Sequence, residues 1–120
     1  MNIVMKQVYW ALGSVVHATY AAFIAEVTQY NNMISPGRHE WNPDQIITTK
    51  PIRVVYEALW KDEDDTIDLN IGTPDTPLTM GQILFAINNE TYDFFKETSP
   101  HYFEGLAFKG GNTYELVIGS

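Results

Sequence analysis

The clearest hydrophobic pattern in the chain lies between Thr79 and Thr98. Apolar or small side chains recur there at spacings of three and four, as on one buried helix face: Met80, Ile83, Leu84, Ile87, Thr91 and Phe94 or Phe95. Gln82 follows Thr79 at the spacing of a capping box, in which both side chains satisfy free backbone N–H groups. Pro100 ends the pattern, because a residue before proline avoids the helical conformation. We therefore predict a core helix from Thr79 to near Thr98.

Strand-like segments flank this helix on both sides. One predicted hairpin joins residues 52–60 to residues 66–71, where polar and apolar positions alternate. The other joins residues 101–108 to residues 113–118 across a turn with two glycines. Gly105 predicts a bulge or a close backbone approach. The expected fold class is α+β, in the order α-β-β-α-β-β: a mainly antiparallel sheet of four or five strands with two helices packed on it.

Residues 1–32 also carry apolar side chains at helical spacing, and they do so over a wide arc. One stripe contains Val8, Leu12, Val15, Thr19, Phe23 and Val27. We expect a helix here that is buried on more than one side. Gly13-Ser14 leaves open whether it is one helix or two, with Ser14 as a possible cap of the second. The β-branched residues Ile3, Val4 and Val8 leave open a short strand at the start.

The same N-terminal stretch has few charges. Residues 7–25 carry none when His17 is neutral, which is almost enough length to span a bilayer. Several polar side chains disfavour a membrane span. A signal peptide is disfavoured because residues 18–22 lack a small-x-small cleavage pattern. We expect a protein without a membrane anchor, located in the cytoplasm.

Composition narrows the class of protein. At 120 residues the chain fits a single domain, 1–120, with a real core. Hydrophobic residues make 45% and charged residues 18%, which excludes a disordered chain. Seven basic against fifteen acidic residues leave a net charge of −8, which argues against nucleic-acid binding and is compatible with a basic protein partner. The absence of cysteine excludes a disulfide scaffold and a cysteine-ligated zinc site.

Residues 33–51 read as a long connection with turn signals, and residues 45–49 are a candidate strand within it. Its tip carries the first candidate partner-binding residues, Arg38, His39 and Trp41. An exposed tryptophan there would be a binding anchor. The alternative is an indole that folds back to cover the core.

The second candidate partner-binding group is the acidic turn of the first hairpin, Asp62, Glu63, Asp64 and Asp65. It lacks the calcium-loop pattern, and neighbouring side chains in a turn diverge, so no metal site is expected. A solvated turn that keeps sheet edges apart is the simpler interpretation.

Catalytic signatures are absent from the sequence. There is no nucleophile elbow, phosphate-binding loop or dinucleotide fingerprint, and the three histidines lack metal-ligand spacing. We therefore expect no catalytic residue and no cofactor. His101 and Glu104 are candidate ligand-binding groups, as a base and its orienting partner at a strand start. A histidine that only satisfies backbone groups is the plainer alternative.

Three functions remain open. The first is a small acidic non-enzymatic protein-interaction module, an inhibitor, immunity-type or adaptor protein, that binds a basic or self partner. The second is a small-ligand-binding protein or enzyme, with a pocket between the central helix, the sheet and the Arg38–Trp41 loop. The third is a structural homodimer subunit with the first helix at its interface. Five aromatic residues lie close together between Tyr92 and Phe103, which favours a thick core between sheet and helices and leaves a ligand pocket or an oligomer interface as the alternative.

Overall fold

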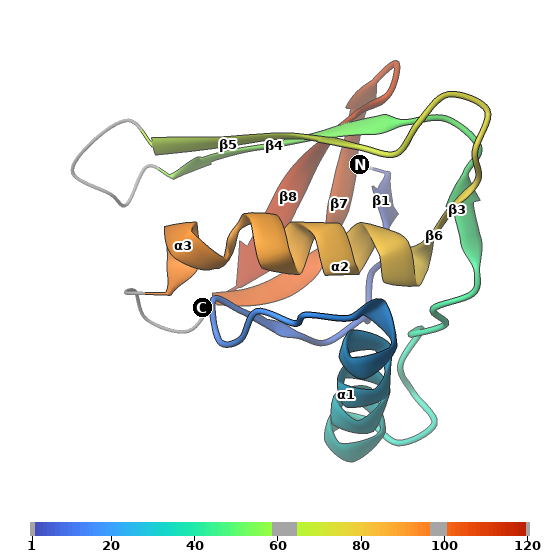
Figure 1. Cartoon of the computed structure of the whole chain (residues 1–120), viewed down its shortest axis with the longest axis vertical. Coiled ribbons are helices and arrows are strands. Elements are labelled where there is room, and N and C mark those ends of the chain that lie inside the picture. The colour runs from blue at the N-terminus through green and yellow to red at the C-terminus, as the bar shows by residue number, and fades with distance from the viewer. Residues whose placement is uncertain (1, 59–64, 97–100, 120) are drawn as a thin grey trace.

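The computed structural model describes residues 2–58, 65–96 and 101–119 (Figure 1). In chain order its elements are β1 (Ile3–Val4), β2 (Ala11–Leu12), α1 (Tyr20–Ile34), β3 (Ile46–Thr48), β4 (Ile52–Ala58), β5 (Asp65–Ile71), β6 (Leu78–Thr79), α2 (Met80–Glu90), α3 (Tyr92–Phe95), β7 (His101–Gly110) and β8 (Thr113–Gly119). None of the helices in these ranges is long and apolar enough to cross a membrane.

One sheet organises the described part of the chain. Its strand order is β1-β7-β8-β4-β5, and β2 pairs with β7 farther along the same edge. Neighbouring strands are antiparallel except for β4 and β8, which are parallel. A separate two-stranded ribbon joins β3 to β6. The α+β class and the mainly antiparallel sheet are confirmed, whereas the short strands β1 and β2 make the sheet larger than the four or five strands predicted.

Both predicted hairpins are present. Residues 52–58 pair with 65–71, so Asp65 belongs to a strand and not to the turn. β7 and β8 form the second hairpin around Gly110 and Gly111, which both adopt positive φ. The bulge predicted at Gly105 is also present as a shift of register. A Cβ added at Gly105 would lie 2.8 Å from Ile3 Cγ2, so glycine lets β1 approach β7 closely.

The predicted core helix is α2, and it lies between the β4–β5 hairpin and the N-terminal segment (Figure 1). The capping box is confirmed: Gln82 N–H donates to Thr79 Oγ1 at 3.2 Å, and Thr79 N–H donates to Gln82 Oε1 at 2.9 Å. The predicted stripe is buried throughout: Met80, Ile83, Leu84, Ile87, Thr91 and Phe95.

The predicted end of this helix, near Thr98, is wrong. α2 ends at Glu90, and the one-turn helix α3 follows. Thr91 leaves the helical conformation with ψ near zero, and its hydroxyl donates to the Ile87 carbonyl at 2.6 Å. A threonine that bonds back to the preceding turn competes with the regular backbone ladder. The apolar stripe continues across this break because α3 places Phe95 in the same core.

The predicted helix over the first 32 residues is also wrong in its first half. A strand is present at Ile3–Val4, as the β-branched residues allowed, but α1 begins only at Tyr20. Thr19 caps it, whereas Ser14 donates its hydroxyl hydrogen to the Ala11 carbonyl at 2.6 Å. Gly13 has φ of +80°, and a Cβ there would lie 2.7 Å from Phe95 Cβ. A helix cannot pass through that position.

Asparagine side chains replace the missing backbone partners of this extended segment. Asn31 Oδ1 accepts from Tyr9 N–H at 2.8 Å, and its Nδ2 donates to the Tyr9 carbonyl at 2.9 Å. In the same way, Asn89 Oδ1 accepts from His17 N–H at 3.2 Å, and Asn89 Nδ2 donates to the His17 carbonyl at 3.0 Å. Asn88 accepts from Trp10 Nε1–H at 2.8 Å. Buried backbone groups need partners, and these amides supply them where no strand runs alongside.

Candidate functional site

The loop predicted to bind a partner lies against α1. Trp41 is only 7% exposed, and its Nε1–H donates to Thr28 Oγ1 at 2.9 Å. His39 Nδ1 accepts from Trp41 N–H at 3.2 Å, so its Nε2–H donates to Asn32 Oδ1 at 2.8 Å. The indole therefore covers the core, which was the alternative interpretation, and it is not an exposed anchor. Arg38 remains exposed at the tip of the loop.

Most of the acidic turn lies outside the residues that the structure describes. Asp62, Glu63 and Asp64 lie outside the described residues, and Asp65 is described only as the first residue of β5. Within the described ranges, no group of three or more histidine or acidic side chains is placed to hold a metal ion.

The two candidate ligand-binding groups lie in different surroundings. His101 is half-buried, with its ring centroid 5.1 Å from that of Phe95. Glu104 is exposed at the β7 bulge, between Phe103 and Gly105, and its side chain lies over Gly119 of β8. Neither residue lines the cavities described below.

A histidine–carboxylate pair appears where sequence analysis had expected only a helix. His17 Nε2 contacts the carboxylate of Glu26, and its ring packs edge-on against Phe23. Its other nitrogen, Nδ1, is buried without a hydrogen-bond partner in the described structure. That nitrogen faces protein and not solvent. It attaches the segment before α1 to the helix.

An aromatic cleft of about 290 Å³ opens between the end of α1 and the start of β7. Its lining is almost entirely apolar and aromatic: Tyr9, Trp10, Tyr30, Ile34, Tyr102 and Phe103. Burial raises the pKa of the Tyr30 phenol, and the nearby Tyr102 raises it further. No local pattern in the sequence brings these residues together.

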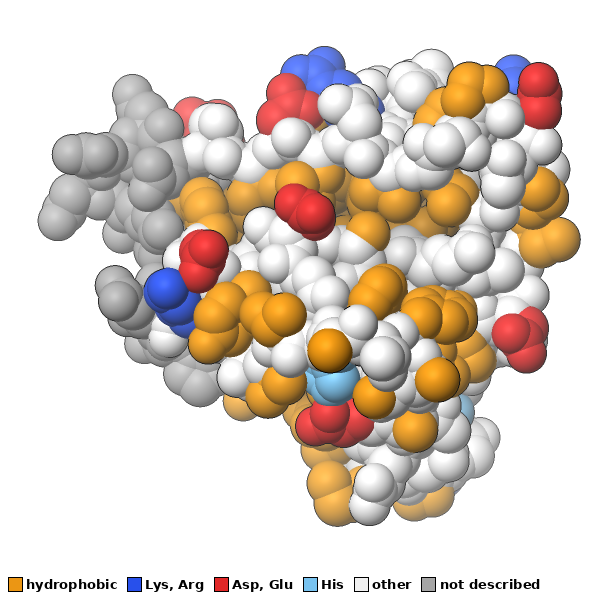
Figure 2. Space-filling model, viewed as in Figure 1, with side chains coloured by type: hydrophobic (Ala, Val, Ile, Leu, Met, Phe, Trp, Pro, Cys, Tyr) orange, Lys and Arg blue, Asp and Glu red, His pale blue; other side chains and the backbone are white. Residues whose placement is uncertain are grey.

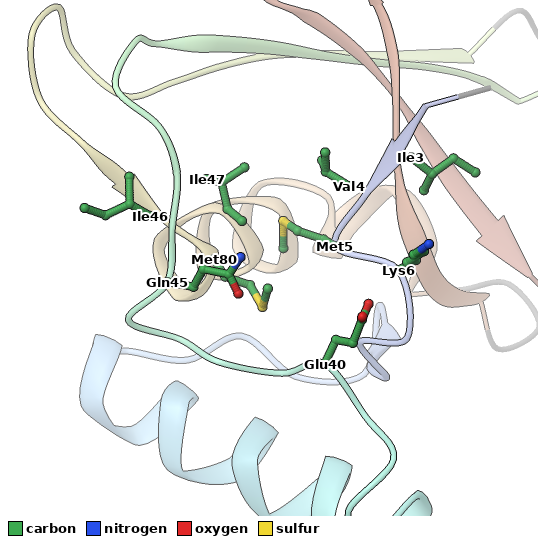
Figure 3. A pocket seen from close by; sticks show the side chains of 9 residues that line it. All are labelled: Ile3, Val4, Met5, Lys6, Glu40, Gln45, Ile46, Ile47 and Met80. Atoms are coloured by element: carbon green, nitrogen blue, oxygen red, sulfur yellow. The ribbon is translucent and has the colours of Figure 1, made fainter.

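A second cavity, of about 480 Å³, lies on another side of the molecule (Figure 3). It is lined by residues of three separate segments: Ile3, Val4, Met5, Lys6, Glu40, Gln45, Ile46, Ile47 and Met80. It thus occupies the junction of the sheet, the 38–41 loop and the start of α2, where the sequence suggested a pocket. Its polar groups are Lys6, Glu40 and Gln45 instead of His101 and Glu104.

The surface of α1 carries little charge. Glu26 is the only charged residue of the helix, and it contacts His17. Figure 2 shows hydrophobic side chains on this end of the molecule and also over other parts of the same face. Six of the eight large hydrophobic side chains that are exposed in the described structure lie on α1, just before it, or beside the aromatic cleft: Val15, Val16, Tyr20, Met33, Ile34 and Tyr102. We call these six residues the α1 surface.

The chain matches no family model, and neither a curated protein nor a solved structure gives a significant match to it.

Proposed function

We propose that this chain is a small non-enzymatic protein-interaction module that binds a protein partner through the α1 surface. The observation that carries this proposal is the set of exposed hydrophobic side chains on and around one helix with a single charged residue, beside an aromatic cleft. Apolar patches of this kind mark interaction sites on soluble proteins. Aromatic side chains supply much of the binding energy in such sites.

The partner that the charge distribution favours is a second copy of the chain. Each copy carries a net charge of −8, so most pairs of faces would bring acidic groups together. The α1 surface contains no acidic residue, and the single carboxylate of α1 already contacts His17. Two copies can therefore meet there without a repulsive pair of charges. A cytoplasmic location is part of this proposal, whereas nucleic-acid and membrane binding are not.

The experiment is to measure the mass in solution by light scattering at micromolar concentration, in low and in high salt. We expect twice the mass of one chain in both, since an apolar interface is not screened by salt. Met33→Lys should give the monomer, because Met33 is 70% exposed and lies at the end of α1 next to the cleft. The matched control, Ile46→Lys, changes an exposed hydrophobic residue away from α1 and should leave the dimer intact.

Two results would overturn the proposal of self-association. The first is a monomeric wild type at every concentration tested. The second is a dimer that both lysine variants weaken equally, since the interface would then not involve α1. Circular dichroism of each variant shows whether the chain is still folded.

A further inference from the structure

The cavity of Figure 3 is held open by fixed contacts between its walls. Glu40 N–H donates to the Gln7 carbonyl at 2.9 Å, which ties the 38–41 loop to the turn after β1. Met80 N–H donates to the Gln45 carbonyl at 2.8 Å, which ties the start of α2 to the segment before β3. Backbone hydrogen bonds therefore fix all three segments that surround the cavity.

The turn beside the cavity has an unusual backbone. Met5 and Gln7 both have a backbone φ of +58°, which residues other than glycine seldom adopt. The two residues flank Lys6. Strained conformations persist where the surrounding structure demands them, and they gather at ligand sites. Here the turn places the Met5 side chain in the core and the Lys6 side chain at the cavity.

The interior of the cavity is apolar and adaptable. The thioether side chains of Met5 and Met80 lie at its centre, and both residues are buried. Ile46 and Ile47 lie at the end opposite Lys6 (Figure 3). Methionine has a flexible, polarisable side chain that fits apolar groups of different shape. This part of the cavity is therefore suited to an aliphatic or thioether side chain.

The other end of the cavity carries opposite charges. Figure 3 shows Lys6 and Glu40 on the same side of the cavity, which both of them line. Within the described ranges, neither of them forms an ion pair within 4.0 Å, with the other or with any third group. A molecule that carries only a negative or only a positive group would meet one repulsive partner here. A molecule with both groups would meet two attractive ones.

From these features we propose that the cavity binds a small zwitterion with an apolar side chain, that is, a free apolar α-amino acid. Its carboxylate pairs with Lys6, its ammonium group pairs with Glu40, and its side chain packs on the two methionines. Gln45 also lines the cavity, on the side of Met80. The volume of about 480 Å³ lies within the range of small-molecule sites. This inference does not depend on the function proposed for the α1 surface.

The direct test is to titrate isotope-labelled protein with L-leucine and to follow the chemical shifts of its backbone amides by NMR. We expect saturable shifts at residues of the three cavity segments. The related molecules 4-methylpentanoate, which lacks the ammonium group, and 3-methylbutylamine, which lacks the carboxylate, should bind more weakly by roughly tenfold each, the loss expected for one charged hydrogen bond. N-Acetyl-L-leucinamide lacks both charges and should bind least.

Two variants give a crossed pattern that only recognition of the head group explains. Lys6→Met should weaken binding of leucine and of 4-methylpentanoate by roughly tenfold, with little change for the amine. Glu40→Gln should weaken leucine and the amine, with little change for the acid. Both side chains are exposed, so the fold is retained. The matched controls Lys50→Met and Glu90→Gln make the same charge changes away from the cavity.

The proposal fails if leucine, methionine and phenylalanine all produce no saturable shift at millimolar concentration. It also fails if N-acetyl-L-leucinamide binds as tightly as leucine, or if the two variants affect the acid and the amine alike. Each of these results leaves the proposal for α1 untouched, because its test measures mass and not ligand binding.

Discussion

The two long helices of this protein combine apolar burial and amide hydrogen bonds in different proportions. α2 presents an unbroken apolar stripe to the sheet, with Ile83, Leu84 and Ile87 fully buried. α1 buries Phe23 and Val27, but its third buried residue is Asn31, which bonds a backbone from a distant part of the chain. Apolar contact is tolerant of direction, whereas a buried amide works only in one arrangement. α2 is therefore held mainly by buried apolar area, although Asn88 at its C-terminal end also bonds the N-terminal segment, whereas α1 buries less apolar area and depends more on its amide.

The largest effect should come from the core of α2. Leu84→Ala removes buried methyl groups and leaves a cavity, which costs about 3 kcal/mol of unfolding free energy. Urea denaturation measures this loss. Ile46→Ala, a truncation of an exposed side chain, should change stability by less than about 0.5 kcal/mol. A loss below about 1 kcal/mol for Leu84→Ala would mean that the stripe is not closely packed.

Next in size is the loss of the Asn31 amide. Asn31→Leu keeps the volume of the side chain but leaves the N–H and carbonyl of Tyr9 unpaired, which costs about 2 kcal/mol in the same denaturation experiment. Gln29→Leu makes a similar change on the exposed side of α1 and should be neutral within about 0.5 kcal/mol. A gain in stability for Asn31→Leu would mean that burial of apolar surface, and not hydrogen bonding, holds α1 as well as α2.

A smaller effect distinguishes the starts of the two helices. Both have a threonine cap at the same distance, 3.2 Å, but only α2 has the reciprocal glutamine, because Ala22 takes that position in α1. Ala22→Gln should therefore raise the unfolding free energy by up to about 0.5 kcal/mol, and Gln82→Ala should lower it by a similar amount. Thermal denaturation detects both. Ala25→Gln, farther along α1, is the control, and an equal gain there would indicate general helix propensity instead.

The smallest effect lies on the solvent face of the sheet, away from both helices. A bidentate hydrogen bond from Arg53 lowers the pKa of Asp68 below its ordinary value of 3.8, and the charge of Arg53 adds to this. A depressed folded-state pKa contributes stability above pH 3.8 that is lost as the pH falls through the folded value. Asp68→Asn should flatten the acid side of the melting-temperature profile slightly, because the pair is exposed. Asp44→Asn is the exposed control.

Sequence reasoning succeeded where the structural signal is local. The α2 capping box, both hairpins and the Gly105 bulge depend on residues a few positions apart, and all four are present. The extended segment before α1 is not predicted by the sequence pattern, because its structure depends on contacts with distant residues. Its backbone partners are side chains 22 and 72 positions away, so its helical spacing of apolar residues was misleading. Tertiary contacts overrode a local pattern there.

For the candidate sites, too, local patterns were informative and contacts between distant residues were not. Trp41 was found as a notable residue, but whether an indole faces solvent depends on Thr28 of α1, which no spacing reveals. His17 and Glu26 contact each other across the bend at Thr19, and a continuous helix would have placed them apart. Lys6 gave no sequence signal at all. It faces the cavity because of two positive φ angles, which side-chain type does not predict.

The parallel pairing of β4 with β8 has a consequence for the order in which the protein is made. β8 is the last strand in the chain, yet it lies between β7 and β4 and joins the two hairpins. The contact between Asn112 and Pro51 spans 61 positions. While the chain emerges from the ribosome, the first hairpin and α2 are complete before the strand that links them to the rest has been translated. Their apolar faces must wait uncovered, and this interval is when a chaperone or a neighbouring chain can bind them.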